Sequence, residues 1–215
     1  MTFREGMRID LTALASRDAY SWMTSTITPR PIAWVSTISA EGKTNLAPFS
    51  FFQGVTSAPP SLMFVPVNLR DGSKKDTVRN IEATGEFVVN LVSFAQAELM
   101  NRCAALLPYG ESEFEAFGVP SVAAESVKPP RVAGAPVSFE CRLHSITRIG
   151  EGAGAANVVF GLIGVMHVDD AVIGAEGKVD PVKLDLVARL GGESYSRLGE
   201  IFSIKRPDRT APGAR

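Results

Sequence analysis

The sequence predicts a mainly β protein whose strands form a closed antiparallel barrel with helices on the outside. Five or six apolar segments of strand length recur along the 215 residues, and hairpins or short helices join most of them. This arrangement differs from the regular strand and helix alternation of a doubly wound parallel sheet. Residues 32–35 and 62–65 are apolar on both faces of a strand. A barrel buries one face inside, and helices or a second copy of the chain must cover the other, so we expect a homodimer.

A hairpin in the first quarter of the chain is the segment around which the rest is arranged. Residues 31–39 and 46–56 are rich in β-branched and aromatic side chains, and Gly42 between them supplies the positive φ of the turn. Pro48 removes a ladder donor from the second run, which confines that end to a sheet edge or a bulge. Small polar groups such as Ser50 lie there among aromatic ones, a mixture suited to a planar, hydrogen-bonding ligand.

The remaining segments are predicted from their hydrophobic period and their breakers. In the second helix Asp76 is expected as the N-cap and Gly85 as the C-terminal stop, and Pro181 fits the first position of the last helix. The expected helices are residues 11–24, 76–84, 95–107 and 181–190. The expected strands after the hairpin are residues 61–67, 87–92, 137–148 and 158–168, and residues 195–204 are expected as a final short strand or an extended arm. Surface loops are expected over residues 68–75 and 108–134, the second with one small helical patch around residues 113–117.

Composition indicates one domain over residues 1–206, followed by a disordered tail over residues 207–215. The 22 basic and 23 acidic side chains give no overall field for nucleic acid or an anionic membrane, so an anionic ligand needs a local cluster of donors. The longest apolar segment, residues 158–166, is much shorter than the ~20 residues that span a bilayer. The N-terminus does not resemble a signal peptide. Cys103 and Cys141 lack CxxC spacing, which indicates inert thiols rather than a redox pair, and we expect a soluble cytoplasmic protein.

Residues 73–77 (SKKDT) are the sharper candidate for an anion site. A loop with two lysines runs into a predicted helix start, where unpaired backbone N–H groups and the positive end of the helix dipole converge. Lys75 and Thr77 flank Asp76, whose carboxylate is expected to cap the helix, and together these residues favour a phosphate site. The alternative is a solvated charged loop that does no more than cap the helix.

The two histidines give little support to other chemistries. His144 and His167 lie in strand-like segments without a second His, Cys or carboxylate at ligand spacing, so no metal site is predicted. His167 closes the last long strand beside two aspartates. The sequence contains neither GxSxG nor a Gly-rich phosphate fingerprint after a strand, and two histidines do not suggest a Ser-His-Asp arrangement.

An ordered set of short motifs runs from about residue 20 to about residue 205. The motifs are RPIAWVST (30–37), NLAPFSFF (45–52), PP (59–60), KDT (75–77), TGEFVVN (84–90), PPR (129–131), PVSFEC (136–141), HVDD (167–170), DPVKLD (180–185), RLGG (189–192) and Tyr195. Each is weak alone, but together and in this order they resemble the flavin reductase-like family of FMN-binding split barrels. That family includes flavoredoxin and the reductase partners of two-component monooxygenases.

The resemblance implies a six-stranded antiparallel Greek-key split β-barrel with peripheral helices, a homodimer, and FMN bound near the dimer interface. It assigns the FMN phosphate to Lys75 and Thr77, where the helix start already indicates an anion. It places Arg189 and Tyr195 over the flavin and His167 toward the nicotinamide. The cofactor-binding residues that it implies are Arg30, Ser36, Thr37, Asn45, Ala47, Pro48, Phe49, Ser50, Phe51, Phe52, Lys75, Thr77, Arg189 and Tyr195.

The activity that the resemblance implies is an NAD(P)H-dependent flavin oxidoreductase, which passes a hydride from NADH or NADPH to N5 of FMN. The flavin carries the chemistry, so no catalytic side chain is assigned. A partner monooxygenase or redox protein would receive the electrons. Two alternatives stay open: a flavoredoxin-like FMN electron carrier reduced by a protein, and a barrel that binds FMN or another phosphorylated planar ligand without turning it over. Residues 101–132 carry no motif with an assigned role.

Overall fold

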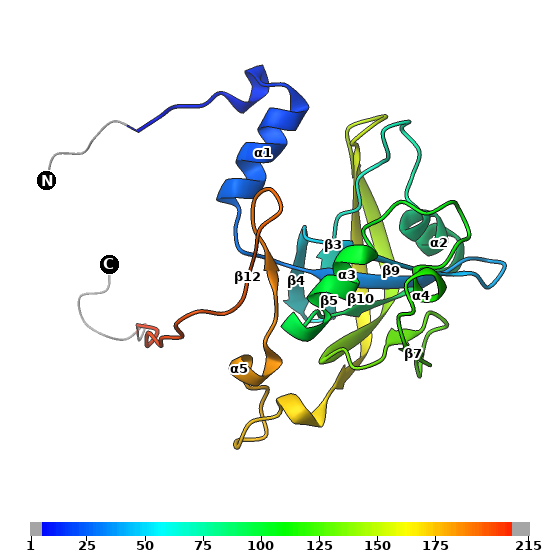
Figure 1. The fold of residues 1–215 in the computed structure, drawn as a ribbon, viewed down its shortest axis with the longest axis vertical. Coiled ribbons are helices and arrows are strands. Elements are labelled where there is room, and N and C mark those ends of the chain that lie inside the picture. The colour runs from blue at the N-terminus through cyan, green and yellow to red at the C-terminus, as the bar shows by residue number, and fades with distance from the viewer. Residues whose placement is uncertain (1–5, 208–215) are drawn as a thin grey trace, which may run out of the picture.

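The computed structural model describes residues 6–207, so the tail expected over residues 207–215 lies almost wholly outside the described residues. Its centre is a seven-stranded sheet in the order β3-β2-β6-β9-β10-β5-β4, and every neighbouring pair is antiparallel (Figure 1). The strands are β2 (Ala33–Ile38), β3 (Thr44–Phe49), β4 (Phe52–Ser57), β5 (Pro60–Phe64), β6 (Glu86–Asn90), β9 (Val137–Ile149) and β10 (Ala156–Val168). The expected mainly β antiparallel architecture is confirmed.

The two edges of this sheet are consecutive in the chain. Ser50 and Phe51 alone separate β3 from β4, so the sheet must curl until its edges meet, which makes it a split barrel. The carbonyl of Phe51 accepts the N–H of Val65 at 2.9 Å, so the connecting residues also pair with the segment after β5. The single strand expected over residues 46–56 is therefore wrong. It breaks at the barrel closure, and this break gives seven strands in place of six.

The barrel is packed on both sides of β2. Inside it, the ring of Phe64 lies between those of Phe49 and Phe87, with centroid distances of 5.3 and 5.5 Å. On the outer face, Trp34 packs with Met100 and other apolar residues of the segments that follow β6. Both expected faces of residues 32–35 are thus buried, and peripheral segments of the same chain cover the outer one.

Helices surround the barrel, and several differ from their predicted lengths. The helices are α1 (Ser16–Thr26), α2 (Asp76–Thr84), α3 (Ala97–Arg102), α4 (Glu113–Ala116) and α5 (Pro181–Leu184), with 3-10 turns at Leu11–Ala13, Phe94–Gln96 and Asp170–Val172. The helix expected over residues 95–107 ends after Arg102, where the N–H of Cys103 is shared between the carbonyls of Leu99 and Met100. The helix expected over residues 11–24 is broken, because the backbone of Leu14 and Ala15 is extended.

Short strand pairs account for the C-terminal differences. The strands are β1 (Arg30–Pro31), β11 (Ala188–Arg189) and β12 (Tyr195–Ser196) in one small sheet, and β7 (Ser121–Val122) with β8 (Arg131–Val132) in another. The helix expected over residues 181–190 stops at Asp185, whose φ is 44°, and the chain then pairs with β1. Strand pairing thus overrides the helical pattern. Of the short strand or extended arm expected over residues 195–204, only Tyr195–Ser196 forms a strand.

Two turn glycines have the positive φ that the sequence indicates. Gly42, between β2 and β3, has φ 84°, and Gly85, after α2, has φ 70°. These values lie where a side chain is disfavoured, so both positions suit glycine.

Gly161 of β10 provides a test of the barrel interior. A Cβ at this position would lie 2.3 Å from Cζ of Phe87, whereas a Cβ at Gly54 of the edge strand β4 would meet no atom within 4 Å. We expect Gly161→Ala to lower the free energy of unfolding by about 1–3 kcal/mol through overpacking, and Gly54→Ala to change it by less than about 0.5 kcal/mol. Urea denaturation of both variants measures this, and equal effects would contradict the packing.

Candidate functional site

The start of α2 has an open N-terminus. Asp76 is the first helical residue and Lys75 the N-cap, with extended backbone angles and no side chain that caps the helix in the described chain. The Lys75 carbonyl accepts the N–H groups of Val78 and Arg79 at 3.0 and 3.2 Å. The expectation that the Asp76 carboxylate caps this helix is wrong by one position, because Asp76 already has helical geometry. The first N–H groups of α2 thus remain available to an anion.

Buried amides fix this helix start against the edge strand. Asn45 of β3 donates to the hydroxyl oxygens of Thr77 at 3.1 Å and Thr37 at 3.2 Å, and Asn80 of α2 donates to Thr37 at 3.0 Å. All four side chains are buried. Because the Thr77 oxygen accepts from Asn45, its hydroxyl hydrogen is free to donate into the neighbouring cavity.

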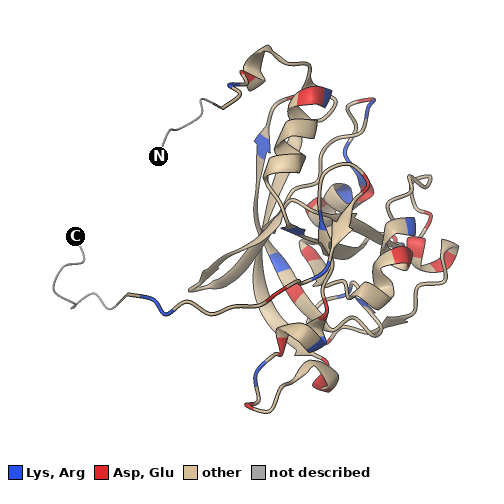
Figure 2. Ribbon diagram, turned by 60° about the vertical axis from the view of Figure 1, so that its left-hand side comes forward, with Lys and Arg blue, Asp and Glu red and all other residues tan. Residues whose placement is uncertain are grey.

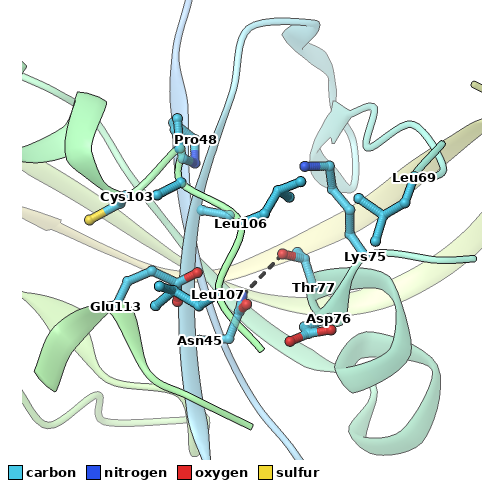
Figure 3. Close-up of a pocket in the computed structure, with 13 residues that line it drawn as sticks. Asn45, Pro48, Leu69, Lys75, Asp76, Thr77, Cys103, Leu106, Leu107 and Glu113 are labelled. Carbon is cyan, nitrogen blue, oxygen red and sulfur yellow. Dashed lines mark hydrogen bonds between the residues drawn. The ribbon is translucent and has the colours of Figure 1, made fainter. Parts of the chain in front are cut away.

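A cavity of about 120 Å³ lies between α2, β3 and the segment after α3 (Figure 3). Its walls are Asn45, Ala47, Pro48, Leu69, Lys75, Asp76, Thr77, residues 103–107 and Glu113. Burial lowers the pKa of Lys75, which the nearby carboxylates of Glu113 and Asp76 partly oppose. The neighbouring Lys74 instead pairs with Glu82 at 2.7 Å, and no ion pair involves Lys75 within residues 6–207. Lys75 is therefore the lysine of the loop that is free to meet a ligand.

Two carboxyl groups share this cavity. Glu113, in α4, is 6% exposed, and Asp76 lies beside Lys75. Burial raises the pKa of both carboxyls, and Lys75 acts in the opposite direction on each. The sequence analysis missed Glu113 and residues 103–107 as site residues, because they lie in a segment without a motif. A glutamate inside a short helix flanked by apolar residues was the available signal.

A second cavity of about 260 Å³ adjoins the first, and both are lined by Pro48 and Ala104. Its other wall residues are Tyr20, Ile32, Phe49, Ser50, Met100, Asn101, Arg189 and Tyr195. The guanidinium of Arg189 stacks 4.4 Å over the ring of Tyr195, and the Tyr195 hydroxyl donates to Asn101 at 3.0 Å. The small sheet of β1, β11 and β12 brings both residues to this place.

Arg30 supports the second cavity from behind. Its guanidinium donates to the carbonyls of Thr24 at 2.6 Å, Ile27 at 2.8 Å and Leu190 at 2.9 Å. Its Nε lies 3.4 Å from the Ser50 hydroxyl. Arg30 therefore ties the end of α1 and the C-terminal segment to the barrel closure, and it does not line either cavity.

The two cavities bring together part of the expected cofactor-binding set. The residues in their walls are Asn45, Ala47, Pro48, Phe49, Ser50, Lys75, Thr77, Arg189 and Tyr195, and those outside are Arg30, Ser36, Thr37, Phe51 and Phe52. Ser36 is buried and donates to the carbonyl of Pro130. Phe51 packs edge-to-face on Tyr20, and Phe52 packs against the barrel core. Thr37 lies behind Asn45.

His167 lies in a separate hollow. Its Nε2 is 2.7 Å from Oε1 of the fully buried Glu140, which also accepts from the N–H of Glu125 and from the N–H and hydroxyl of Ser126. The hollow beside it is lined by residues 131–135 and 166–169 together with Val122. Within one chain, His167 therefore does not reach the cavities, and its contact with a nicotinamide stays a prediction.

Residues of both charge signs are interspersed over the ribbon (Figure 2). Within residues 6–207 no group of three His, Cys, Asp or Glu side chains is arranged to hold a metal ion. Cys103 and Cys141 are free and buried, and burial raises the pKa of Cys103 to about 12. Among the described residues no helix is both long and apolar enough to cross a membrane.

The fold defines a split β-barrel protein with two adjoining cavities along β3, one of which is lined by Lys75 and Thr77. Residues 23–181 match the family described as "Flavin reductase like domain", and the chain belongs to this flavin reductase-like family. An uncharacterised protein of Deinococcus radiodurans is 40% identical over 92% of this chain and 88% of its own.

Two solved structures extend the comparison. Nitrilotriacetate monooxygenase component B from Bacillus cereus is 31% identical, with a TM-score of 0.88 over 94% of this chain and 100% of that one. The 2-nitrobenzoate 2-nitroreductase NbaA of Pseudomonas fluorescens is 30% identical, with a TM-score of 0.83 over 97% of this chain and 100% of that one. Together with the family, these relatives support a flavin reductase role.

The buried Glu140 predicts a specific acid sensitivity. Burial raises the pKa of its carboxyl, but hydrogen bonds from Ser126, the Glu125 backbone and His167 outweigh this effect and hold the pKa at about 2, below its usual 4.5. A pKa lowered by folding gives stability that is present above the unfolded value and is lost as pH falls toward 2. We expect the free energy of unfolding of wild type to exceed that of Glu140→Gln by about 3 kcal/mol at pH 6, and this difference should close as pH approaches 2.

Urea denaturation at a series of pH values measures this gap. Glu151→Gln, at an exposed position in the β9–β10 turn, is the control and should follow wild type throughout. A gap for Glu140→Gln that stays constant between pH 6 and pH 2 would rule out the charged, hydrogen-bonded carboxylate as its source.

Proposed function

We propose that this protein is an NAD(P)H-dependent flavin oxidoreductase that uses FMN, built as one split-barrel domain over residues 1–206. The observation that carries the proposal is the pair of adjoining cavities along β3, with Lys75 and Thr77 lining one and Arg189 and Tyr195 lining the other. Membership of the flavin reductase-like family supports the same function.

The first cavity fits the phosphate of FMN. The Lys75 ammonium, the Thr77 hydroxyl and the uncapped N–H groups of α2 are donors of the kind that phosphate oxygens need. An anion beside Lys75 would also offset the burial that disfavours its charged form. These groups would bind and orient the phosphate end.

The second cavity fits the ring end of the same molecule. At about 120 Å³ the first cavity suits a phosphate and part of a chain, whereas the second, at about 260 Å³, has apolar walls from Ile32 and Met100. The Ser50 hydroxyl, which Arg30 approaches, and the stacked pair of Arg189 and Tyr195 are polar and flat groups suited to a heteroaromatic ring. They would cover the ring and limit water around it.

When bound, FMN supplies the hydride chemistry, taking a hydride at N5 from C4 of NADH or NADPH. The residues of this chain bind and orient the reactants, and no side chain acts as a general acid or base. The electrons would pass to a partner monooxygenase, by analogy with nitrilotriacetate monooxygenase component B, or to another redox protein. A flavoredoxin-like carrier and a non-catalytic FMN-binding protein are the competing functions.

We also propose a homodimer in the cytoplasm. α1 stands away from the barrel in Figure 1. Its Tyr20, Trp22 and Met23, and Ile27 at its C-cap, are between 39% and 56% exposed, which supports a second copy as their cover. The free cysteines support a reducing compartment. Sedimentation as a monomer at micromolar concentration would contradict the dimer.

The phosphate assignment predicts a selective loss of affinity in Lys75→Met. Because Lys75 meets the phosphate and not the ring, FMN should bind about 10–100-fold more weakly while riboflavin, which lacks the phosphate, binds as to wild type. Quenching of flavin fluorescence measures both constants. Lys74→Met removes the neighbouring lysine, which pairs with Glu82, and should leave both constants unchanged. Equal losses for FMN and riboflavin would remove the phosphate from this position.

The proposed activity predicts that a nicotinamide reduces the bound flavin. Anaerobic addition of NADH or NADPH to the FMN-loaded protein should bleach the flavin absorbance, and the faster of the two reactions identifies the reductant. Flavin that stays oxidised with both nicotinamides but accepts electrons from a reduced redox protein would assign the carrier function instead. Failure to take up FMN would remove both.

A further inference from the structure

Glu113 is a cavity residue that the phosphate site does not use. Its Oε2 accepts the N–H of Leu46 at 2.8 Å, and the adjacent Ser112 hydroxyl lies 2.6 Å from that of Thr44. These two contacts dock α4 on β3, which is an edge strand with unpaired backbone groups. Glu113 therefore has a structural task, but that task occupies one of its two oxygens.

The carboxylate has further acceptor capacity inside the cavity. Within residues 6–207 the Leu46 N–H is the one hydrogen-bond donor to the Glu113 side chain, which is 94% buried, and the residue forms part of the cavity wall. A carboxylate offers about four acceptor positions, and buried polar groups are nearly always paired. The Glu113 carboxylate can therefore accept a further hydrogen bond from a ligand in the cavity.

The position of Glu113 along β3 indicates which part of the ligand supplies that donor. Asn45 holds Thr77, Leu46 contacts Glu113, Pro48 lines both cavities and Ser50 lines the ring cavity. At about 3.3 Å per residue, Asn45 to Ser50 spans about 17 Å, comparable with an extended FMN molecule. Along β3, Glu113 therefore lies between Lys75 and Thr77 on one side and the second cavity on the other. This is the position of the chain that links phosphate to ring.

Electrostatic repulsion makes the phosphate an unsuitable partner for the Glu113 carboxylate. Figure 3 shows Glu113 and Lys75 on opposite sides of the cavity, Lys75 beside Thr77 and Glu113 beside the strand. A phosphate next to Glu113 would place like charges together in a buried site, which is strongly unfavourable. Uncharged hydroxyl groups, in contrast, donate well to a carboxylate.

We propose that Glu113 accepts hydrogen bonds from the hydroxyl groups of the ribityl chain and so makes this site selective for flavins that carry a polyol. The inference rests on the proposed function, because it takes the ligand to be FMN. It adds a specificity-determining residue from a segment that no motif identifies.

Three flavins that differ by one part each test this assignment. Lumiflavin has the ring alone, riboflavin adds the ribityl chain, and FMN adds the phosphate. In wild type, riboflavin should bind at least about tenfold more tightly than lumiflavin. Glu113→Gln keeps an acceptor for the Leu46 N–H but loses the charge, and it should reduce this ratio about tenfold while leaving the ratio of FMN to riboflavin unchanged. Glu115→Gln, an exposed position of the same helix, should alter neither ratio.

Deoxyriboflavins, each lacking one ribityl hydroxyl, keep the test valid even if the Glu113 variant folds poorly. With wild type, at least one analogue should lose about tenfold in affinity. The proposal is overturned if every analogue binds like riboflavin, if Glu113→Gln leaves the riboflavin to lumiflavin ratio unchanged, or if it strengthens FMN relative to riboflavin. If none of the three flavins binds wild type, the proposed function itself fails, an outcome separate from these three.

Discussion

The passage of the chain from β3 to β4 through Ser50 and Phe51 is the constraint on which the structure depends. Seven strands pair in one order, and the first and last of them are neighbours in sequence. The two linking residues can bridge less than about 11 Å between the end of β3 and the start of β4, so the two edges of the sheet must lie close together. Closure buries Phe49, Phe64 and Phe87 against one another and places the end of β3 beside the small sheet that carries Arg189 and Tyr195.

The edge of the barrel at β3 explains why a site forms there. An edge strand leaves backbone groups without partners in the sheet. In β3 the N–H of Leu46 donates to the Glu113 carboxylate instead, and Pro48 has no N–H that needs a partner. Asn45 then uses its side chain to hold the start of α2. The same polar groups that close the edge also surround the cavity, so the structural and binding tasks share one row of residues.

The balance of charge in the cavity favours a ligand with distinct parts. One ammonium, from Lys75, faces two carboxyl groups, from Asp76 and Glu113, and burial disfavours the charged form of all three. Such a site does not attract anions by charge alone. In the proposed complex, oriented donors at the helix start would bind the phosphate, and the Glu113 carboxylate would face an uncharged part of the ligand.

The sequence by itself determined the elements with strong local signals. The apolar faces of residues 32–35, the edge position of Pro48, the turn at Gly42 and the end of α2 at Gly85 all follow from local chemistry. Lys75 and Thr77 do line one cavity, and the binding of an anion there stays a prediction. These features depend on backbone conformation and hydrophobic period, which neighbouring residues fix.

The tertiary structure decided what depends on contacts between distant segments. It broke the strand over residues 46–56 at the closure, ended the helix expected over residues 181–190 by pairing Ala188–Arg189 with β1, and moved the N-cap of α2 to Lys75. It also brought Glu113 to Leu46, 67 positions away in sequence. Burial, strand pairing and the path of the barrel closure are properties of the folded chain, so a pattern along the sequence does not contain them.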